Sequence, residues 1–192
     1  MDAAAVFERV SARFADDVTA FTAAVDKDGP RDASFKVKPT ALLAVFRMLR
    51  DDEALRFDFL QNLTAVDWPK QDRIDVVYHL YSYEHRHEIV VKVELPRTAP
   101  RLPSLASLYK IADWLEREQY DLLGVIFEGH PDLRRLLLPD DWVGHPMRKD
   151  WKEPKSYRGM PTTRHSPIDL IGLYDKEHAP RPAPPAPSPS RT

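Results

Sequence analysis

The chain has 192 residues, and its 28 basic and 30 acidic side chains leave a formal net charge of -2. This balance argues against a general nucleic-acid binder and a polybasic membrane anchor, since both need surplus positive charge to meet phosphate. The absence of cysteine excludes disulfides, thiolate metal sites, iron–sulfur ligation and cysteine nucleophiles. The sequence shows neither a run of about 18 apolar residues nor a signal-peptide pattern, so we expect no membrane-spanning helix and no signal peptide.

The first part of the chain alternates between helical and strand patterns. Asp2 is an expected helix cap, and the apolar residues after it recur at helical spacing. Residues 18–25 and 34–38 are expected as strands, joined by a turn over residues 26–30. Pro39 then marks the start of a second helix. These patterns predict a domain that mixes helices with strands.

Three strands are expected next, and the last two give the clearest hairpin signal in the chain. Residues 56–66 are the first strand. Residues 74–81 and 89–95 alternate apolar and polar side chains on the two sides of the charged stretch 84–86. A proline-rich loop over residues 96–103 follows. The pattern therefore predicts an antiparallel pair in the middle of the domain.

Two helices are expected after the hairpin. Ser104 is a candidate N-cap, and the helix that it opens would carry an i,i+4 ion pair between Asp113 and Arg117. Gly124 is the expected left-handed cap at the end of this helix, and a last short helix is expected from Pro131. The element order predicts an α+β fold: a two-layer sandwich of a mixed, largely antiparallel sheet with helices, followed by an extended C-terminal arm.

Proline divides the chain into three expected parts. Most of the 18 prolines lie at or after Pro139, and proline disfavours helix at the residue before it. An α+β domain over residues 1–139 is therefore expected to lead into an extended arm over residues 140–178. The arm is rich in large apolar side chains, so it either packs on its own domain or binds a partner, and we favour a partner. Residues 179–192 form a low-complexity tail that we expect to be disordered.

The sequence contains no strong catalytic signal. The G-x-G-x-x-G and Walker A motifs of nucleotide sites are missing, and no serine lies in a G-x-S-x-G context. Glu116 and Glu118 point in different directions on a helix, which makes them a poor acid/base pair. His85 and His87 would share one face of a strand as a zinc or copper site, but no third ligand stands at a diagnostic spacing. A solvated hairpin end is the simpler interpretation of these histidines.

A dense stretch of charged and apolar residues covers residues 114–137. Its charged residues lie next to the apolar face of the expected helix, which fits a surface packed against another subunit. The stretch follows a fixed pattern of Glu-Arg-Glu, two free positions, an acidic residue and two apolar residues, then six free positions, His or Lys, and a basic residue with an apolar pair. The matching positions are Glu116, Arg117, Glu118, Asp121, Leu122, Leu123, His130, Arg134, Leu136 and Leu137.

This pattern resembles the signature of the C-type (30 kDa) subunit family of the proton-pumping NADH:quinone oxidoreductase, respiratory complex I. Residues 58–68 and 141–150 are also similar to that family. The resemblance covers roughly residues 1–155. It implies a non-catalytic structural subunit in the peripheral arm of a complex that oxidises NADH, reduces quinone and translocates protons.

The resemblance also implies partners, cofactors and a location. The chain would pack against the D-type (49 kDa-like) subunit near the quinone site, close to the B- and I-type iron–sulfur subunits. It would bind no cofactor or metal itself, whereas FMN and iron–sulfur clusters would lie in partner subunits. The complex would place it at the cell inner membrane on the cytoplasmic side, or on the matrix side in mitochondria, with membrane association only through the other subunits.

Two sets of residues are candidate partner contacts. The first set comprises the signature residues Glu116, Arg117, Glu118, Asp121, Leu122, Leu123, His130 and Arg134. The second set lies in the arm and comprises Trp142, Gly144, His145, Pro146, Arg148 and Lys149. Two alternatives stay open. One is the equivalent subunit of a related membrane-bound hydrogenase or ferredoxin-linked complex, and the other is a free-standing metal-dependent enzyme that uses His85 and His87.

Overall fold

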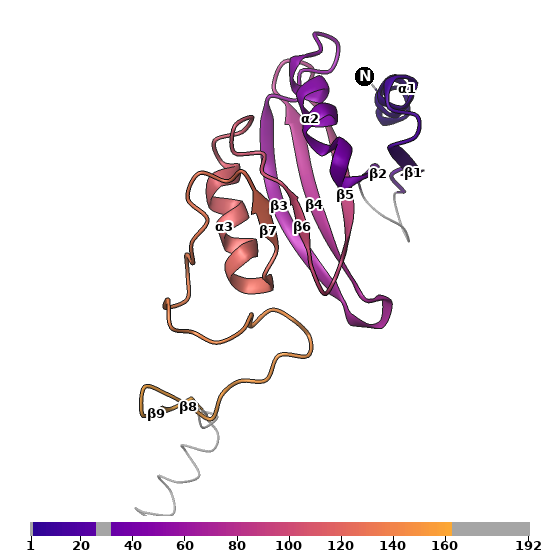
Figure 1. Cartoon of the computed structure of the whole chain (residues 1–192). Helices are drawn as coiled ribbons and strands as arrows, with labels where there is room; N and C mark the ends of the chain where they lie inside the picture. The colour runs from indigo at the N-terminus through magenta and orange to yellow at the C-terminus, as the bar shows by residue number, and fades with distance from the viewer. Residues whose placement is uncertain (1, 26–31, 163–192) are drawn as a thin grey trace, which may run out of the picture. The chain divides into compact units, whose positions relative to one another are not determined.

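A computed structural model describes residues 2–25 and 32–162 of the chain (Figure 1). The chain separates into two compact units, Met1–Lys152 and Glu153–Thr192. The described part of the second unit contains one antiparallel pair, β8 (Ser156–Tyr157) with β9 (Met160–Pro161). The expected turn over residues 26–30, the end of the arm and the expected disordered tail lie outside the described residues.

The first unit is built on a five-stranded sheet with the strand order β1-β2-β5-β4-β3. The strands are β1 (Val18–Thr22), β2 (Ser34–Val37), β3 (Phe59–Trp68), β4 (Arg73–Ser82) and β5 (His87–Pro96). The β4–β5 hairpin pairs antiparallel, with Tyr78 opposite Val91, as the alternating pattern predicted. Only β2 with β5 is parallel within this sheet. The mixed, largely antiparallel sheet with its helices confirms the predicted α+β fold class.

Helices pack on this sheet where the apolar spacing predicted them. The helical elements are α1 (Ala3–Arg13), η1 (Pro39–Ala41), α2 (Leu42–Asp51), η2 (Pro69–Gln71) and α3 (Ala112–Leu123). The Asp2 side chain caps α1 by accepting the N–H of Ala3, and Pro39 begins the short turn that leads into α2. Figure 1 shows α2 over the sheet and α3 beside β3. None of the helices in the described residues has the length and apolar content needed to cross a membrane.

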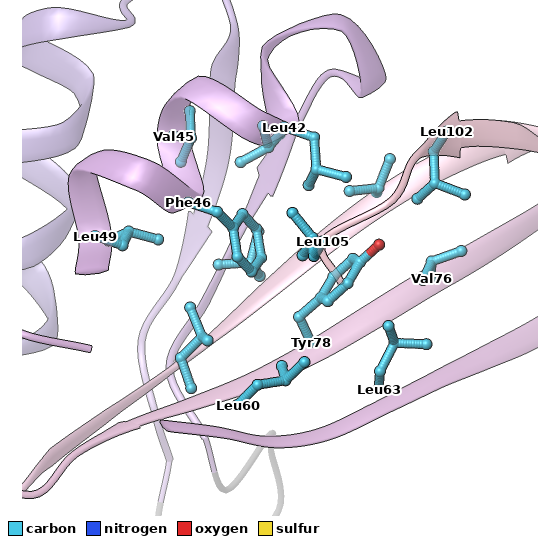
Figure 2. Packing of buried hydrophobic residues seen from close by; sticks show 14 of the residues in the cluster. Leu42, Val45, Phe46, Leu49, Leu60, Leu63, Val76, Tyr78, Leu102 and Leu105 are labelled. Atoms are coloured by element: carbon cyan, nitrogen blue, oxygen red, sulfur yellow. The ribbon is translucent and has the colours of Figure 1, made fainter. Parts of the chain in front are cut away.

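The apolar core lies between α2 and the sheet (Figure 2). The buried face of α2 comprises Leu42, Val45, Phe46 and Leu49. Phe46 meets the Tyr78 ring of β4 edge-on, with the ring centroids 4.9 Å apart. Burying each such side chain stabilises the fold by about 1.5–3 kcal/mol. This core fixes the sheet as a rigid support for the elements that follow it.

Four local predictions are wrong. The strand expected from residue 56 begins at Phe59, because Arg56 has a positive φ of 43° in the turn after α2. The expected proline loop contains a strand, β6 (Arg101–Pro103), which pairs in parallel with β7 (Ile126–Glu128). Ser104 lies well before the first residue of α3 and is not its N-cap. No helix begins at Pro131, since the backbone N–H groups of residues 136–138 bind a side chain instead.

The compact unit continues to Lys152, whereas the sequence placed the end of the domain at residue 139. Residues 140–152 contain no helix or strand. Hydrogen bonds from this segment to α3 and to β3 hold it on the domain.

Candidate functional site: the signature helix and the chain that follows it

Gly124 ends α3 in the left-handed conformation, with a φ of 75°, as the sequence predicted. Its N–H donates to the Tyr120 carbonyl at 3.0 Å. A Cβ atom at this position would lie 2.6 Å from Nε2 of His145, which is too close for any real side chain. Glycine is therefore required both by the backbone turn and by the later segment that packs against it.

Glu116 is fully buried and holds the turn between β6 and α3. Its Oε2 accepts the hydroxyl of Ser104 at 2.6 Å, and its Oε1 accepts the backbone N–H of Leu105 at 2.7 Å. Burial raises the pKa of Glu116 to about 7, and the nearby charge of Asp113 adds to this effect, while the two hydrogen bonds oppose it. The Ser104 hydroxyl therefore donates to Glu116 and does not cap the start of α3.

Asp121 organises the irregular chain after β7. Its Oδ2 accepts three consecutive backbone N–H groups, from Leu136 at 3.1 Å, Leu137 at 2.7 Å and Leu138 at 2.8 Å. Its Oδ1 accepts Nη1 of Arg135 at 2.7 Å. Burial alone would raise the pKa of Asp121, but these hydrogen bonds outweigh it and lower the pKa below its usual value. The Asp121 carboxylate thus accepts the backbone N–H groups that carbonyls would accept if residues 136–138 were helical.

Arg117 holds the same segment from the other side. It is almost fully buried, and its guanidinium donates to the carbonyls of Arg134 and Arg135, both at 3.3 Å. It also lies 3.9 Å from the carboxylate of Asp132 and 5.3 Å from the centre of the Trp114 ring.

His130 binds the N-terminal end of α3, and its side chain is fully buried. Nδ1 accepts the backbone N–H of Asp132 at 3.0 Å, so the ring hydrogen lies on Nε2. Nε2 faces the carbonyl oxygen of Asp113 at 3.0 Å and the carboxylate of the same residue at 3.2 Å. The ring nitrogen of His130 therefore lies against Asp113, whereas the sequence predicts an ion pair of Asp113 with Arg117.

The arm residues nearest the domain cap the last turn of α3, whose carbonyl groups lack partners within the helix. The Nδ1 atom of His145 lies 3.0 Å from the Asp121 carbonyl. The N–H of Met147 donates to the Leu122 carbonyl at 3.1 Å, and Nε of Arg148 donates to the Leu123 carbonyl at 2.7 Å. Burial lowers the pKa of His145, so the neutral ring is favoured there.

Arg97 joins the arm to the sheet. Its Nε donates to Oδ1 of Asp67 at 2.7 Å, and its Nη2 pairs with the carboxylate of Asp150. The backbone N–H of Lys149 donates to the second oxygen of Asp67 at 2.9 Å. The hydrogen bond from Arg97 lowers the pKa of Asp67. We call this group of Asp67, Arg97, Lys149 and Asp150 the arm clamp.

Two tryptophans complete the packing of the arm on itself. The rings of Trp142 and Trp151 are stacked with centroids 6.2 Å apart. Gly144 leaves room for Trp151, since a Cβ atom there would lie 2.8 Å from the indole nitrogen. Residues 140–152 are therefore a strap that is hydrogen-bonded to its own domain.

The structure divides the signature residues into two groups. Glu116, Arg117, Asp121 and Leu123 are buried, and the side chain of His130 is buried as well. Glu118 and Leu122 are half-buried, and Arg134 is exposed. The buried residues do not form the surface themselves. They hold the backbone turns whose other residues are exposed. The partner contacts predicted for the signature and for the arm stay predictions, and direct contact is now expected only from the accessible residues.

Sequence reasoning missed several residues of this site. Arg97, Asp67 and Arg135 each pair with a carboxylate or guanidinium far away in sequence. Asp67 lies in the stretch 58–68 that resembles the family, and this resemblance could have pointed to Asp67 as a site residue. No sequence pattern pointed to Arg97 or Arg135, because a single arginine in a loop has no diagnostic spacing.

The histidines of the β4–β5 hairpin bind backbone carbonyls. Nε2 of His85 lies 2.9 Å from the Glu53 carbonyl, and Nε2 of His87 lies 2.8 Å from the Leu55 carbonyl. Within residues 2–25 and 32–162, no group of three potential ligands could hold a metal ion. The metal-dependent enzyme alternative thus finds no ligand set in the described part of the chain.

The fold and the signature define a class of small α+β subunits in which one helix anchors a long irregular C-terminal segment. Residues 35–157 match the family model described as respiratory-chain NADH dehydrogenase, 30 Kd subunit, and the chain belongs to this family. The C-type subunit of the NADH-quinone oxidoreductase of Roseiflexus sp. (strain RS-1) is 44% identical over 151 residues, which cover 78% of this chain and 84% of that protein. The predicted family is thereby confirmed.

Two solved structures are similar to the chain. The trypsin-resistant fragment (1-134) of Nqo5 matches with a TM-score of 0.54 and 29% identity, over 69% of this chain and 100% of the fragment. A chain of the membrane-bound sulfane sulfur reductase, an archaeal respiratory membrane complex, matches with a TM-score of 0.64 and 21% identity, over 98% of each chain. The second likeness is one of fold.

Proposed function

We propose that this chain is a non-catalytic structural subunit in the peripheral arm of a proton-translocating NADH:quinone oxidoreductase. Membership of the 30 kDa subunit family and the names of the relatives support this assignment. The observation that carries the structural role is what the acidic signature side chains bind. Glu116 binds the hydroxyl of Ser104 and the backbone N–H of Leu105. Asp121 binds the backbone N–H groups of residues 136–138 and so holds the irregular segment after β7 in one shape.

We further propose that the D-type subunit lies over the surface around the C-terminal half of α3, near the quinone site. Leu137 and Met147 are more than half exposed there, and Val143 is 83% exposed. Asp121 and Leu122 of α3 bind the backbone N–H groups of Leu137 and Met147. Val143 lies between Trp142 and Gly144, whose carbonyls accept from the guanidinium that pairs with Asp121. Exposed apolar groups on a rigid support are typical of a protein interface.

The remaining parts of the proposal concern neighbours, cofactors and location. The B- and I-type iron–sulfur subunits would lie close by. FMN and the iron–sulfur clusters would belong to partner subunits, and this chain would bind none of them. The complex would hold the chain at the inner membrane on the cytoplasmic or matrix side. The family supports each of these points, and the quinone type is left open.

A second candidate function is the equivalent subunit of a related membrane complex. The likeness in fold to a chain of the membrane-bound sulfane sulfur reductase favours it, because that chain aligns over nearly its whole length. Membrane-bound hydrogenases and ferredoxin-linked complexes belong to the same group of alternatives.

A tagged full-length chain, recovered from mild-detergent membranes of its own cells, tests the proposal. Mass spectrometry should identify D-, B- and I-type subunits, and the recovered material should reduce quinone with NADH. Recovery of a nickel–iron hydrogenase large subunit or of sulfur reductase subunits would move the assignment to the second candidate. Recovery of the chain alone from assembled membranes would contradict both functions.

A further inference from the structure

Glu116 is a buried carboxyl group without a strong positive partner. Its side chain has no exposed surface. Among the described residues, no lysine or arginine nitrogen lies within 4.0 Å of its oxygens, and the nearest group that can carry positive charge is His130, with Nε2 3.9 Å from Oε2. An ionised carboxylate in such a place is costly, and the usual response of a protein is to keep a proton on it.

The groups that face Glu116 come from every element packed around it. Ser104 donates from the turn after β6, His130 lies after β7, and Asp113 on α3 itself adds negative charge. Tyr78 lies on the β4 side, and in the described part of the chain its buried hydroxyl has no hydrogen-bond partner (Figure 2). Burial, and after it the charge of Glu116, raise the pKa of Tyr78 well above its ordinary value. The surroundings are therefore neutral or negative.

We propose that Glu116 is a proton-binding site of the folded chain, and that its protonation is coupled to the Ser104 hydroxyl in the turn after β6. A proton from solvent would bind Oε2 and reverse the hydrogen bond with Ser104, so that the carboxyl donates and the hydroxyl accepts. The backbone N–H of Leu105 keeps its acceptor on Oε1 in both states.

The coupling follows from the hydroxyl of Ser104. This hydroxyl donates to Oε2 of Glu116 at 2.6 Å, and its oxygen accepts the backbone N–H of Ala106 at 3.1 Å. When the carboxyl group donates instead, the hydroxyl oxygen accepts from both Glu116 and Ala106. The Ala106 amide therefore reports the protonation of Glu116.

The direct test is an NMR titration of the full-length chain with ¹³C-labelled glutamate, from about pH 5 to about pH 9. The carboxyl carbon of Glu116, assigned through its bonds to the backbone, should titrate with a midpoint of about 7. The amide resonances of Leu105 and Ala106, which donate to Glu116 Oε1 and to the Ser104 hydroxyl oxygen, should shift with the same midpoint. The Glu116→Gln variant should remove these shifts, while Glu118→Gln, at a half-buried position on the same helix, should leave them in place.

Two results would overturn the inference. A midpoint near the ordinary glutamate value of about 4.3 would show that Glu116 is ionised at neutral pH. A midpoint of about 7 without a matching shift at Ala106 would remove the coupling to the Ser104 turn. The titration of the wild-type chain tests the inference even if the Glu116→Gln variant fails to fold. Because no partner is needed, the outcome is separate from that of the pull-down.

Discussion

The carboxylate of Asp121 and the guanidinium of Arg135 meet at 2.7 Å beside the C-terminal end of α3. The same guanidinium donates to the carbonyls of Trp142 at 2.9 Å and Gly144 at 3.3 Å. One ion pair thus connects the helix with the segment after β7 and with the strap. Because the Asp121 side chain is fully buried, removing its charge should loosen all three.

The Asp121→Asn variant should lose about 3 kcal/mol of unfolding free energy, because an amide nitrogen would face backbone donors and Arg135 would lose its counter-charge. The pKa of Asp121 is lowered in the folded chain. Its contribution is therefore complete above the unfolded pKa and is lost as the pH falls through the folded pKa. Urea unfolding at neutral pH measures the loss. Asp140→Asn, at an exposed position nearby, is the control and should change little.

Arg97→Gln should open the arm clamp and leave the carboxylate of Asp67 buried without its cation. The side chain of Asp67 has no exposed surface, so the expected loss is about 3 kcal/mol. Asp150→Asn should cost less, because that carboxylate is 63% exposed and its pair with Arg97 is screened by water. Thermal unfolding of both variants tests the order, and equal losses would contradict the assignment of Asp67 as the buried partner.

Glu116 should make the chain less stable as the pH rises. Its pKa is raised from 4.5 to about 7 on folding, so the folded chain holds a proton that the unfolded chain has released. Its stabilising contribution is complete below about pH 4.5 and is lost as the pH rises through about 7, by at most about 3 kcal/mol. Glu116→Gln should flatten this slope in chemical denaturation series, and Glu118→Gln should not. An unchanged slope in Glu116→Gln would assign the pH dependence to other groups.

Removing residues 140–192 should lower the melting temperature, since the deletion takes away the strap together with the clamp residues Lys149 and Asp150. The sequence favours a partner for this segment, and such a segment would add little to the stability of the isolated chain. Removing only residues 153–192, which belong to the second unit, should leave the melting temperature close to that of the full chain. Calorimetry on the two truncated chains distinguishes these outcomes, and equal melting temperatures would mean that the strap adds no stability.

Val143→Asp should weaken recovery of the D-type subunit in the pull-down without lowering the melting temperature. Val143 is 83% exposed, so a charge there costs the isolated chain little but would be desolvated in an interface. Val25→Asp is the control, because Val25 is half exposed and follows β1, at the opposite edge of the sheet from β3. Equal recovery with both variants would place the partner on another surface.

The sequence predicted those elements in which the spacing of apolar residues alone shows which face is buried. The alternation of β4 and β5 and the spacing of Leu42, Val45 and Phe46 each showed which face is buried. Ser104 misled, because the acceptor that its hydroxyl serves lies twelve residues later on α3. The helix expected from Pro131 failed for a related reason. Its leucines have helical spacing, but the Asp121 carboxylate takes their N–H groups, and no local pattern contains that acceptor.

The arm clamp sets the order in which a growing chain can finish folding. The Asp67 carboxylate is in place once β3 is made, yet the N–H that binds its second oxygen belongs to Lys149, 82 residues later. Until that residue has left the ribosome, the last carbonyls of α3 face water, and Arg97 alone binds the two oxygens of the Asp67 carboxylate. A translational pause before the strap emerges would therefore expose an unfinished domain to chaperones and proteases, whereas completion of the strap closes it in one step.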